Sequence, residues 1–315
     1  MSAPATTDTS AERAWLTTAE KGSVLGIRFL VFLATIFGRG VAGAFMWLVT
    51  FYYVAFSARV RRVLRDYYRH LDGSRPSFVK LWKHVHTFAR VALDRFFFAK
   101  GRDDKFVITR TGHEHLEHVA RGPRGAILMT AHLGSQAAMS AGGHDAQLRI
   151  NIVGYFKNAR MINEVLAKLD PASSARVIHI EPGSATSVLR IKEKVDAGEL
   201  IALAGDRLGL NDRAVEVEFL GARARFPTGP FVLAAMLRCP VYLVFALFRG
   251  GNRYDLFCEP LVDVVTAPRD RRDAALTDIV QRYAQRLEVY CRMAPDNWFN
   301  FYDLWSPAAS TEGSK

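Results

Sequence analysis

Apolar runs of strand length alternate with stretches of helical periodicity over most of the chain. Runs rich in Val, Ile and Leu and bounded by Gly, Pro or Asp predict β-strands at 106–112, 125–132, 149–156, 175–180, 200–207, 215–221 and 240–248. Around them, the spacing of apolar positions predicts helices at 85–98, 113–122, 159–170, 185–198, 229–238 and 274–292. This alternation is typical of an α/β fold with a mostly parallel central sheet flanked by helices. The carboxyl ends of such strands lie on one rim.

The N-terminal part of the chain has a different pattern. Residues 1–22 are small and polar and predict a mobile leader, whereas the apolar stretch 29–57 carries a single charge, Arg39. Because crossing a bilayer takes about 20 apolar residues, the segment 23–57 is predicted to be a membrane anchor, either one helix or a helix pair. Arginines crowd the next stretch, 59–69, and favour the cytoplasmic side and anionic headgroups.

The arrangement of this anchor stays open at the level of sequence. A single span, a half-inserted monotopic pair and a helical hairpin buried in a soluble domain all fit the pattern, because Arg28 and Arg39 interrupt the apolar surface. No repeat or linker divides the remainder of the chain. Residues 58–308 are therefore predicted to form one domain, followed by a short tail at 309–315.

Composition narrows the choice of partner. Hydrophobic residues make up 50% of the 315, and the formal net charge is +11, which together favour a negatively charged membrane surface or another acidic partner. The sequence has no ribonucleoprotein motif, zinc finger or Gly-rich phosphate loop, so it gives no support for nucleic-acid binding. Cys239, Cys258 and Cys291 have neither a zinc spacing nor a disulfide pattern, and they indicate a reducing compartment.

The strand predicted at 125–132 ends in His132, and the turn after it contains Gly134 and Ser135. A histidine at a strand end can take a proton from a hydroxyl when its pKa lies near the working pH. A helix that begins close by offers free N–H groups to an anion. A hydrogen-bonded structural histidine fits the pattern equally well. Positions 136–138 supply no carboxylate to hold the ring.

Further polar residues lie at the same predicted rim or at a helix start. They are Lys157 and Asn158 after the strand 149–156, Asp206 and Arg207 at the end of the strand 200–207, and Arg225, Thr228 and Gly229 before the helix 229–238. Each set is a candidate for binding a phosphate or a polar headgroup. A loop ion pair, a solvated loop or a helix cap explains each of them as well.

Two other motifs receive a structural interpretation. The sequence HEHLEH at 113–118 misses the metalloprotease spacing, because Glu117 stands four residues after His113, and no metal site is predicted. The aromatic segment 296–305, DNWFNFYDLW, is predicted to seal an edge of the core or to touch lipid.

Taken in order, these segments resemble the late lipid A biosynthesis acyltransferases (lauroyl/myristoyl type) of the lysophospholipid acyltransferase superfamily. The resemblance covers nearly the full length. It includes the apolar N-terminal segment, GHEHLEHVARG, GAILMTAHLGS, GYFKNARM, a GDR strand end where the family commonly has Asp-Gln, FLGARARFPTGPFVLA and NWFNFYDLW. It extends in particular to members found outside lipid A synthesis proper, including those of aryl-polyene-type pathways.

The resemblance implies a glycerolipid acyltransferase-like fold behind an N-terminal membrane-associated helical segment. It also implies transfer of an acyl group from acyl carrier protein or acyl-coenzyme A to a lipid or glycolipid hydroxyl, without cofactor or metal, by a cytoplasmic-side domain at the inner membrane. In the family, a His removes the hydroxyl proton, and an Asp or Glu after four further residues orients that His. His132 fits the first position. Gly134 and Ser135 would form the turn and oxyanion site, and substrate contacts would fall on Lys157, Asn158, Asp206, Arg207, Arg225, Thr228 and Gly229.

The acidic position of the family falls on Ala137, and this departure has three explanations. The enzyme is impaired or inactive, or another carboxylate takes over (Asp145, Glu181 or Asp206), or a backbone carbonyl holds the ring. Loss of the orienting acid in a His-based mechanism costs about 10⁴-fold in turnover. Retained acyl transfer is the favoured hypothesis, and a lipid-binding pseudoenzyme of the same fold is the alternative.

Overall fold

The structure is a computed structural model that describes residues 24–145, 148–154, 176–179, 184–208 and 213–305. The main sheet consists of β1 (Val107–Thr111), β2 (Ile127–Thr130), β3 (Ile150–Gly154), β4 (Val177–His179), β5 (Leu200–Ala204), β8 (Val241–Phe248) and β9 (Arg253–Val262). Its strand order is β1-β9-β8-β2-β5-β3-β4, and each neighbouring pair is parallel except β8 with β9. The predicted α/β fold with a mostly parallel sheet is confirmed.

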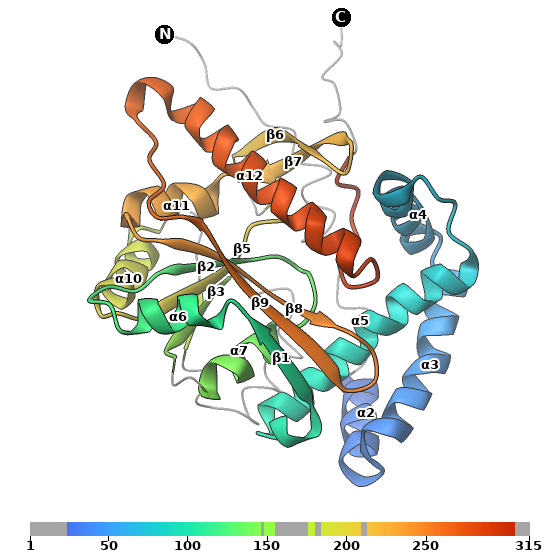
Figure 1. Ribbon diagram of the computed structural model, residues 1–315. Helices are drawn as coiled ribbons and strands as arrows, with labels where there is room; N and C mark the ends of the chain where they lie inside the picture. Colours follow the sequence, from blue (N-terminus) through green and yellow to red (C-terminus); the bar gives the residue numbers. More distant parts are fainter. Residues whose placement is uncertain (1–23, 146–147, 155–175, 180–183, 209–212, 306–315) are drawn as a thin grey trace, which may run out of the picture.

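Helices cover both faces of this sheet (Figure 1). Every residue of β2 and β8 is buried, as expected of strands with helices on both sides. One face packs against α10 (Ala185–Asp196), α11 (Gly229–Leu237) and α12 (Arg272–Met293). The other packs against α6 (His113–Ala120), α7 (Gln136–Asp145) and the C-terminal half of α5 (Phe78–Ala99). All of these helices except α7 agree with predicted ranges, and α7 is the helix expected to begin close to His132. The helix predicted at 159–170 lies outside the described residues.

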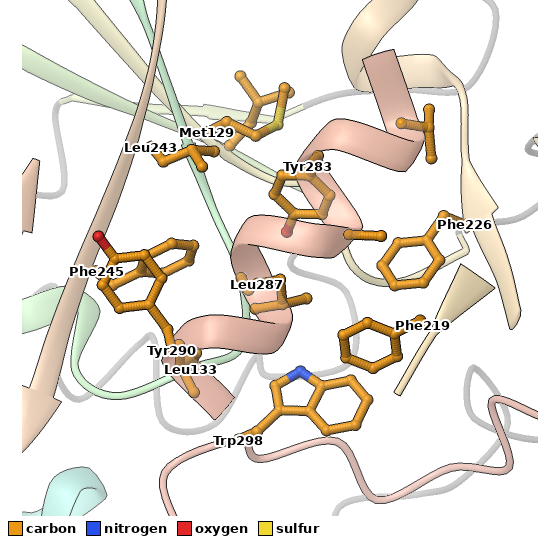
Figure 2. Close-up of a cluster of buried hydrophobic side chains, with 14 of the residues drawn as sticks. Met129, Leu133, Phe219, Phe226, Leu243, Phe245, Tyr283, Leu287, Tyr290 and Trp298 are labelled. Atoms are coloured by element: carbon orange, nitrogen blue, oxygen red, sulfur yellow. The ribbon is translucent and has the colours of Figure 1, made fainter. Parts of the chain in front are cut away.

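The largest part of the core lies between the sheet and α12. Alternate residues of a strand point to the same face, so Met129 of β2 and Leu243 and Phe245 of β8 all face this helix. Figure 2 shows these side chains around Tyr283, Leu287 and Tyr290 of α12, with Phe219, Phe226 and Trp298 completing the cluster.

Two strands depart from the sequence prediction. The stretch 222–227, for which no strand was predicted, is β7 (Ala222–Pro227), which forms a separate antiparallel hairpin with β6 (Ala214–Phe219). β9 was not predicted, because it contains charged residues and Pro260. Its pairing with β1 ends at Phe257, so Pro260 has a strand neighbour only on the β8 side, and a proline is tolerated there.

The N-terminal region begins with a helix pair, α2 (Val24–Ile36) and α3 (Gly38–Phe56), followed by α4 (Ala58–Asp72). In Figure 1, α3 lies alongside α5 at the edge of the molecule. Within the described part of the chain, α3 is the one helix long and apolar enough to cross a membrane, judged by length and composition. The segment predicted as anchor is therefore two helices. The predicted leader and tail lie outside the described residues.

Candidate active site

The strand register brings His132 and Asp206 together. β2 and β5 are parallel neighbours in which Thr130 pairs with Ala204, so the residues two positions further along face each other. His132 Nδ1 lies 2.8 Å from Asp206 Oδ1, and the His132 backbone N–H donates to Asp206 Oδ2 at 3.0 Å. Because an ionised carboxylate only accepts hydrogen bonds, the ring donates from Nδ1 and carries its lone pair on Nε2.

Asp206 is enclosed by donors from the C-terminal segment. Its side chain is 0% exposed, and the Trp298 indole Nε1 donates to Oδ2 at 3.1 Å. The Tyr302 hydroxyl donates to the Asp206 backbone carbonyl at 2.7 Å. Asp206 was predicted both as a substrate contact and as one of three carboxylates that could hold the His132 ring, and its contacts fit the second role. The carboxylate is inaccessible and its oxygens are engaged within the protein, so it holds the His132 ring instead.

His132 itself remains reachable. Its side chain is 32% exposed, and Nε2 makes no hydrogen bond to any residue that the structure describes. One nitrogen of the ring is therefore fixed by a buried carboxylate, while the other is available to an incoming hydroxyl. This is the arrangement that a general base requires.

The charges around the pair keep the ring neutral. Burial and the Arg207 guanidinium lower the pKa of His132 below its ordinary value of 6.5, outweighing the Asp206 carboxylate, which raises it. Burial raises the pKa of Asp206, but the charge and hydrogen bond of His132 and the charge of Arg207 lower it further, to below 3.8. At neutral pH the site thus holds an imidazole ready to accept a proton beside an ionised carboxylate.

The aromatic C-terminal segment lies antiparallel to the loop after β2. Leu133 and Trp298 form an antiparallel bridge, the Phe299 N–H donates to the His132 carbonyl at 2.7 Å, and the Gly134 N–H donates to the Asn297 carbonyl at 2.9 Å. The segment seals a core edge as predicted, and it also forms one wall of the site. Trp298 and Tyr302 were not predicted as site residues. The available signal was that a buried Trp or Tyr needs a partner for its polar atom.

The turn at Gly134 and Ser135 has a structural role. Gly134 adopts a φ of 67°, and a Cβ there would collide with the Ala246 carbonyl of β8. The N–H of Gly134 donates to Asn297, and that of Ser135 donates to Ala246 at 2.8 Å, while the Ser135 hydroxyl accepts from Ala138 at the start of α7. Both amides are used within the fold, which corrects the expectation that they serve an oxyanion.

Arg207 offers a donor beside the pair. Its Nη2 donates to the Phe299 carbonyl at 2.6 Å, while its Nε is buried without a hydrogen-bond partner in the described part of the chain. The guanidinium lies close enough to lower the pKa of His132. A polar group of a bound substrate would satisfy this donor.

A family model matches this architecture. The model of bacterial lipid A biosynthesis acyltransferases matches residues 80–306. The chain belongs to this family. The match includes the whole main sheet, His132, Asp206 and the C-terminal segment. A comparison with curated proteins finds no match for the chain. Membership in this enzyme family brings acyl transfer, an acyl donor, a lipid acceptor and association with the inner membrane.

The position of the family acid, Ala137, lies in the first turn of α7, half-buried against apolar neighbours, and offers no oxygen. Of the three carboxylates considered as replacements, Asp206 contacts His132. Glu181 lies outside the described residues, and the structure does not describe the side chain of Asp145. The acyltransferase therefore has a carboxylate on Nδ1 of its histidine, supplied by the segment that directly follows β5 instead of by α7.

The other predicted substrate residues of the acyltransferase are not brought to this pair by any described hydrogen bond. Lys157 and Asn158 lie outside the described residues. Arg225 is on β7, paired in register with Glu216. Thr228 occupies the N-cap position of α11, but its hydroxyl donates to the Arg213 carbonyl at 3.0 Å instead of capping the helix, and Gly229 is the exposed first residue of α11.

The histidine-rich motif of the acyltransferase forms the exposed helix α6, where His113 lies near Glu114 and Glu117. Within the described residues, no group of three or more His, Cys, Asp or Glu side chains is placed to hold a metal ion.

Proposed function

We propose that this acyltransferase moves an acyl group from a thioester donor, acyl carrier protein or acyl-coenzyme A, to a hydroxyl of a lipid or glycolipid at the cytoplasmic face of the inner membrane. The observation that carries the proposal is the His132–Asp206 pair. Asp206 fixes Nδ1 at 2.8 Å, while Nε2, on a side chain that is 32% exposed, has no hydrogen-bond partner among the residues that the structure describes. His132 is the catalytic base, and Asp206 orients it.

His132 and Asp206 suffice for the proton transfers of this reaction. His132 Nε2 accepts the proton of the acceptor hydroxyl while the oxygen of that hydroxyl attacks the thioester carbonyl carbon. The tetrahedral intermediate then collapses, the carbon–sulfur bond breaks, and the thiolate takes the proton from the imidazolium. Asp206 stabilises that imidazolium, because a carboxylate on Nδ1 favours the charged ring. The ester and a free thiol are the products.

Arg207 is the proposed contact for a polar group of the substrate, through its Nε, which has no hydrogen-bond partner in the described part of the chain. Lys157, Asn158, Arg225, Thr228 and Gly229 remain proposed contacts for an acceptor phosphate or a carrier pantetheine. Their residue types suit that role, and the family match covers all of them.

A second candidate function is a lipid-binding pseudoenzyme that holds an acylated ligand without turning it over. The absence of a carboxylate at Ala137 favours it. The contact between Asp206 and His132 favours the enzyme.

Purified protein in detergent, given labelled acyl carrier protein or acyl-coenzyme A and candidate lysolipids, tests the proposal. We expect transfer by the natural chain, its loss in His132→Ala, and a fall of about 10⁴-fold in Asp206→Asn, as when the orienting acid of a serine-protease triad is removed. Ligand binding without any transfer by the natural chain would support the pseudoenzyme and contradict the proposal.

Ala137→Glu separates the two possible acids. Since Asp206 already occupies Nδ1, this substitution is expected to leave the transfer rate of the natural chain unchanged. A rate increase would show that Asp206 does not orient the base. The same substitution in an Asp206→Asn background measures how far a carboxylate at the family position replaces the one that directly follows β5.

A further inference from the structure

A line of polar side chains joins α3 to the enzyme domain. On α5 these residues recur every four positions and share one helix face: Trp82, His86, Arg90 and Asp94. Opposite them α3 presents Arg39, Gly43 and Thr50. A helix that only served to cross lipid would not need polar partners along its length.

The strongest of these contacts lies at the N-terminal end of α3. Arg39 Nε and Nη2 lie 2.5 Å and 2.6 Å from the two oxygens of Asp94, which is 0% exposed. Asp94 also accepts from the Tyr254 hydroxyl of β9 at 2.7 Å. This bidentate pair therefore ties α3 to both α5 and the central sheet.

The contacts continue toward the C-terminal end. The Arg90 guanidinium lies against Gly43, where a Cβ would collide with it. The Thr50 hydroxyl accepts from the Trp82 indole at 3.1 Å. At the end of α3, Ser57 leads directly into α4, whose Tyr67 ring packs against Trp298 at 5.2 Å between centroids. Both ends of α3 are thus fastened to the same domain.

The opposite side of the helix pair is apolar and exposed. Its large side chains are Phe29, Phe32 and Ile36 of α2 and Val41, Phe45, Leu48, Val49, Tyr52 and Phe56 of α3. Next to this surface, α4 buries its apolar residues and exposes a row of arginines, namely Arg59, Arg62, Arg65 and Arg69. An apolar face beside a cationic row complements the acyl chains and the anionic headgroups of one leaflet.

We infer that α2 and α3 form a monotopic attachment that lies in one leaflet of an anionic bilayer, and that α3 does not span the membrane. A spanning helix has its ends on opposite sides of the bilayer, whereas Arg39 and Ser57 are held by one domain. A span would also draw α5, with Lys80, Lys83 and Asp94, to membrane depth, which is costly for charged side chains. This inference rests on the membrane location in the proposed function and specifies its geometry.

Cysteine accessibility tests the topology in the full chain. Gly40 and Ala58 are exposed positions near the two ends of α3, and Gly40→Cys and Ala58→Cys are introduced singly. Inside-out inner-membrane vesicles are treated with a membrane-impermeant maleimide before and after pore formation. We expect pore formation to change the labelling of neither cysteine. Labelling of one position that appears only after pore formation would establish a span and overturn the inference.

A matched pair of surface variants tests the lipid contact. Leu48 on α3 and Leu189 on α10 are 61% and 59% exposed. Leu48→Glu is expected to lower flotation with phosphatidylethanolamine–phosphatidylglycerol vesicles at least tenfold, and Leu189→Glu to leave it unchanged. Equal flotation of Leu48→Glu and the natural chain would overturn the inference. The inference would also be overturned if the natural chain formed a dimer without lipid and Leu48→Glu dissociated that dimer. A second copy of the chain would then cover this apolar face.

Different experimental results would refute the proposed acyl transfer and the monotopic attachment. A chain that floats and labels as expected but transfers no acyl group would refute the proposed function alone. A chain that transfers acyl groups in detergent but shows a spanning helix would refute only the monotopic attachment.

Discussion

The carboxylate of Asp206 accepts two hydrogen bonds from His132 and one from Trp298. The His132 contacts fix the ring and its backbone, and the indole N–H fixes the second carboxylate oxygen. No described hydrogen bond joins the Trp298 side chain to Nε2 of His132, and its indole contacts Asp206 instead. Trp298 is therefore a positioning residue. Its contribution is to hold the acid at the angle that the histidine needs.

Trp298→Phe removes this donor and keeps an aromatic ring. We expect kcat to fall about fivefold, since one lost hydrogen bond costs about 1 kcal/mol. The acid limb of the kcat/KM profile should move to higher pH, because a carboxylate with one donor fewer binds the imidazolium more strongly and raises the pKa of His132.

Trp305→Phe is the matched control. In the natural chain the Trp305 indole donates to the Phe219 carbonyl at 3.2 Å, not to Asp206. This variant should keep the pH profile of the natural chain. Equal shifts in both variants would assign the effect to packing and refute the positioning role of Trp298.

His84 supports the same segment from α5. Its Nδ1 accepts from the Tyr68 hydroxyl at 3.1 Å, and its Nε2 donates to the Trp298 carbonyl at 3.0 Å. Burial lowers its pKa to about 4, against the opposing effect of Asp296 and the hydrogen bond to Trp298. A histidine held neutral in this way makes the fold sensitive to acid.

Proton uptake by His84 decides how the stability of the fold changes with pH. Between pH 6.5 and about 4 the unfolded chain binds a proton at position 84 that the native chain does not, so stability falls as pH falls, by about 3 kcal/mol over the window. His84→Gln can supply a donor and an acceptor without titrating. Urea unfolding across this range should show a shallower pH dependence for the variant, and identical slopes would contradict the prediction.

At the scale of elements, the pairing of β2 with β5 decides the site. The sequence shows that His132 and Asp206 each end an apolar strand, and the rim was predicted from the α/β pattern. The sequence alone does not show that these two strands are neighbours with Thr130 opposite Ala204. For that reason Asp206 was one of three candidate carboxylates. The roles of Trp298 and Tyr302 depend in the same way on a contact between residues far apart in the chain.

Seven strands were predicted at the right places, β1 to β6 and β8, and the clearest are β2 and β8, which are fully buried and have continuous apolar runs. β9 and β7 were missed for a physical reason. Their exposed positions carry charges, and Pro260 is tolerated only because β1 ends before it. These charged residues and the proline interrupt the apolar pattern by which the other strands were predicted.

A substitution at Gly134 tests how much the close approach of the loop after β2 to β8 contributes to stability. Gly134→Ala should lower the free energy of unfolding by several kcal/mol, because the left-handed φ of 67° and a clash with the Ala246 carbonyl both oppose a side chain. Gly221→Ala is the control, since Gly221 has a φ of 76° with open space around it. It should cost about 1 kcal/mol. Thermal or urea unfolding measures both, and equal losses would show that the close approach at Gly134 is unimportant.

At the scale of the whole molecule, the cysteines report the integrity of the fold. Cys239, Cys258 and Cys291 are free and buried. Burial raises the pKa of Cys239 to about 11 and of Cys258 to about 12, and it raises the pKa of Cys291 well above its ordinary value.

We therefore expect all three thiols to resist maleimide in the native chain and to react in urea, because the thiolate is the nucleophile. Counting modified thiols by mass spectrometry measures this. Rapid modification of any one of them without denaturant would show that the region around it opens in the native state.

The antiparallel contact between residues 132–134 and 297–299 has a consequence for biosynthesis. The ribosome releases a nascent chain from its N-terminus onward, so the helix pair emerges long before Trp298 and Tyr302 are made. Until then Asp206 lacks the hydrogen bonds that Trp298 and Tyr302 donate to it. A product that stops before Trp298 would keep the helix pair yet lack these hydrogen bonds to its acid, and transfer would begin only after this segment has been made.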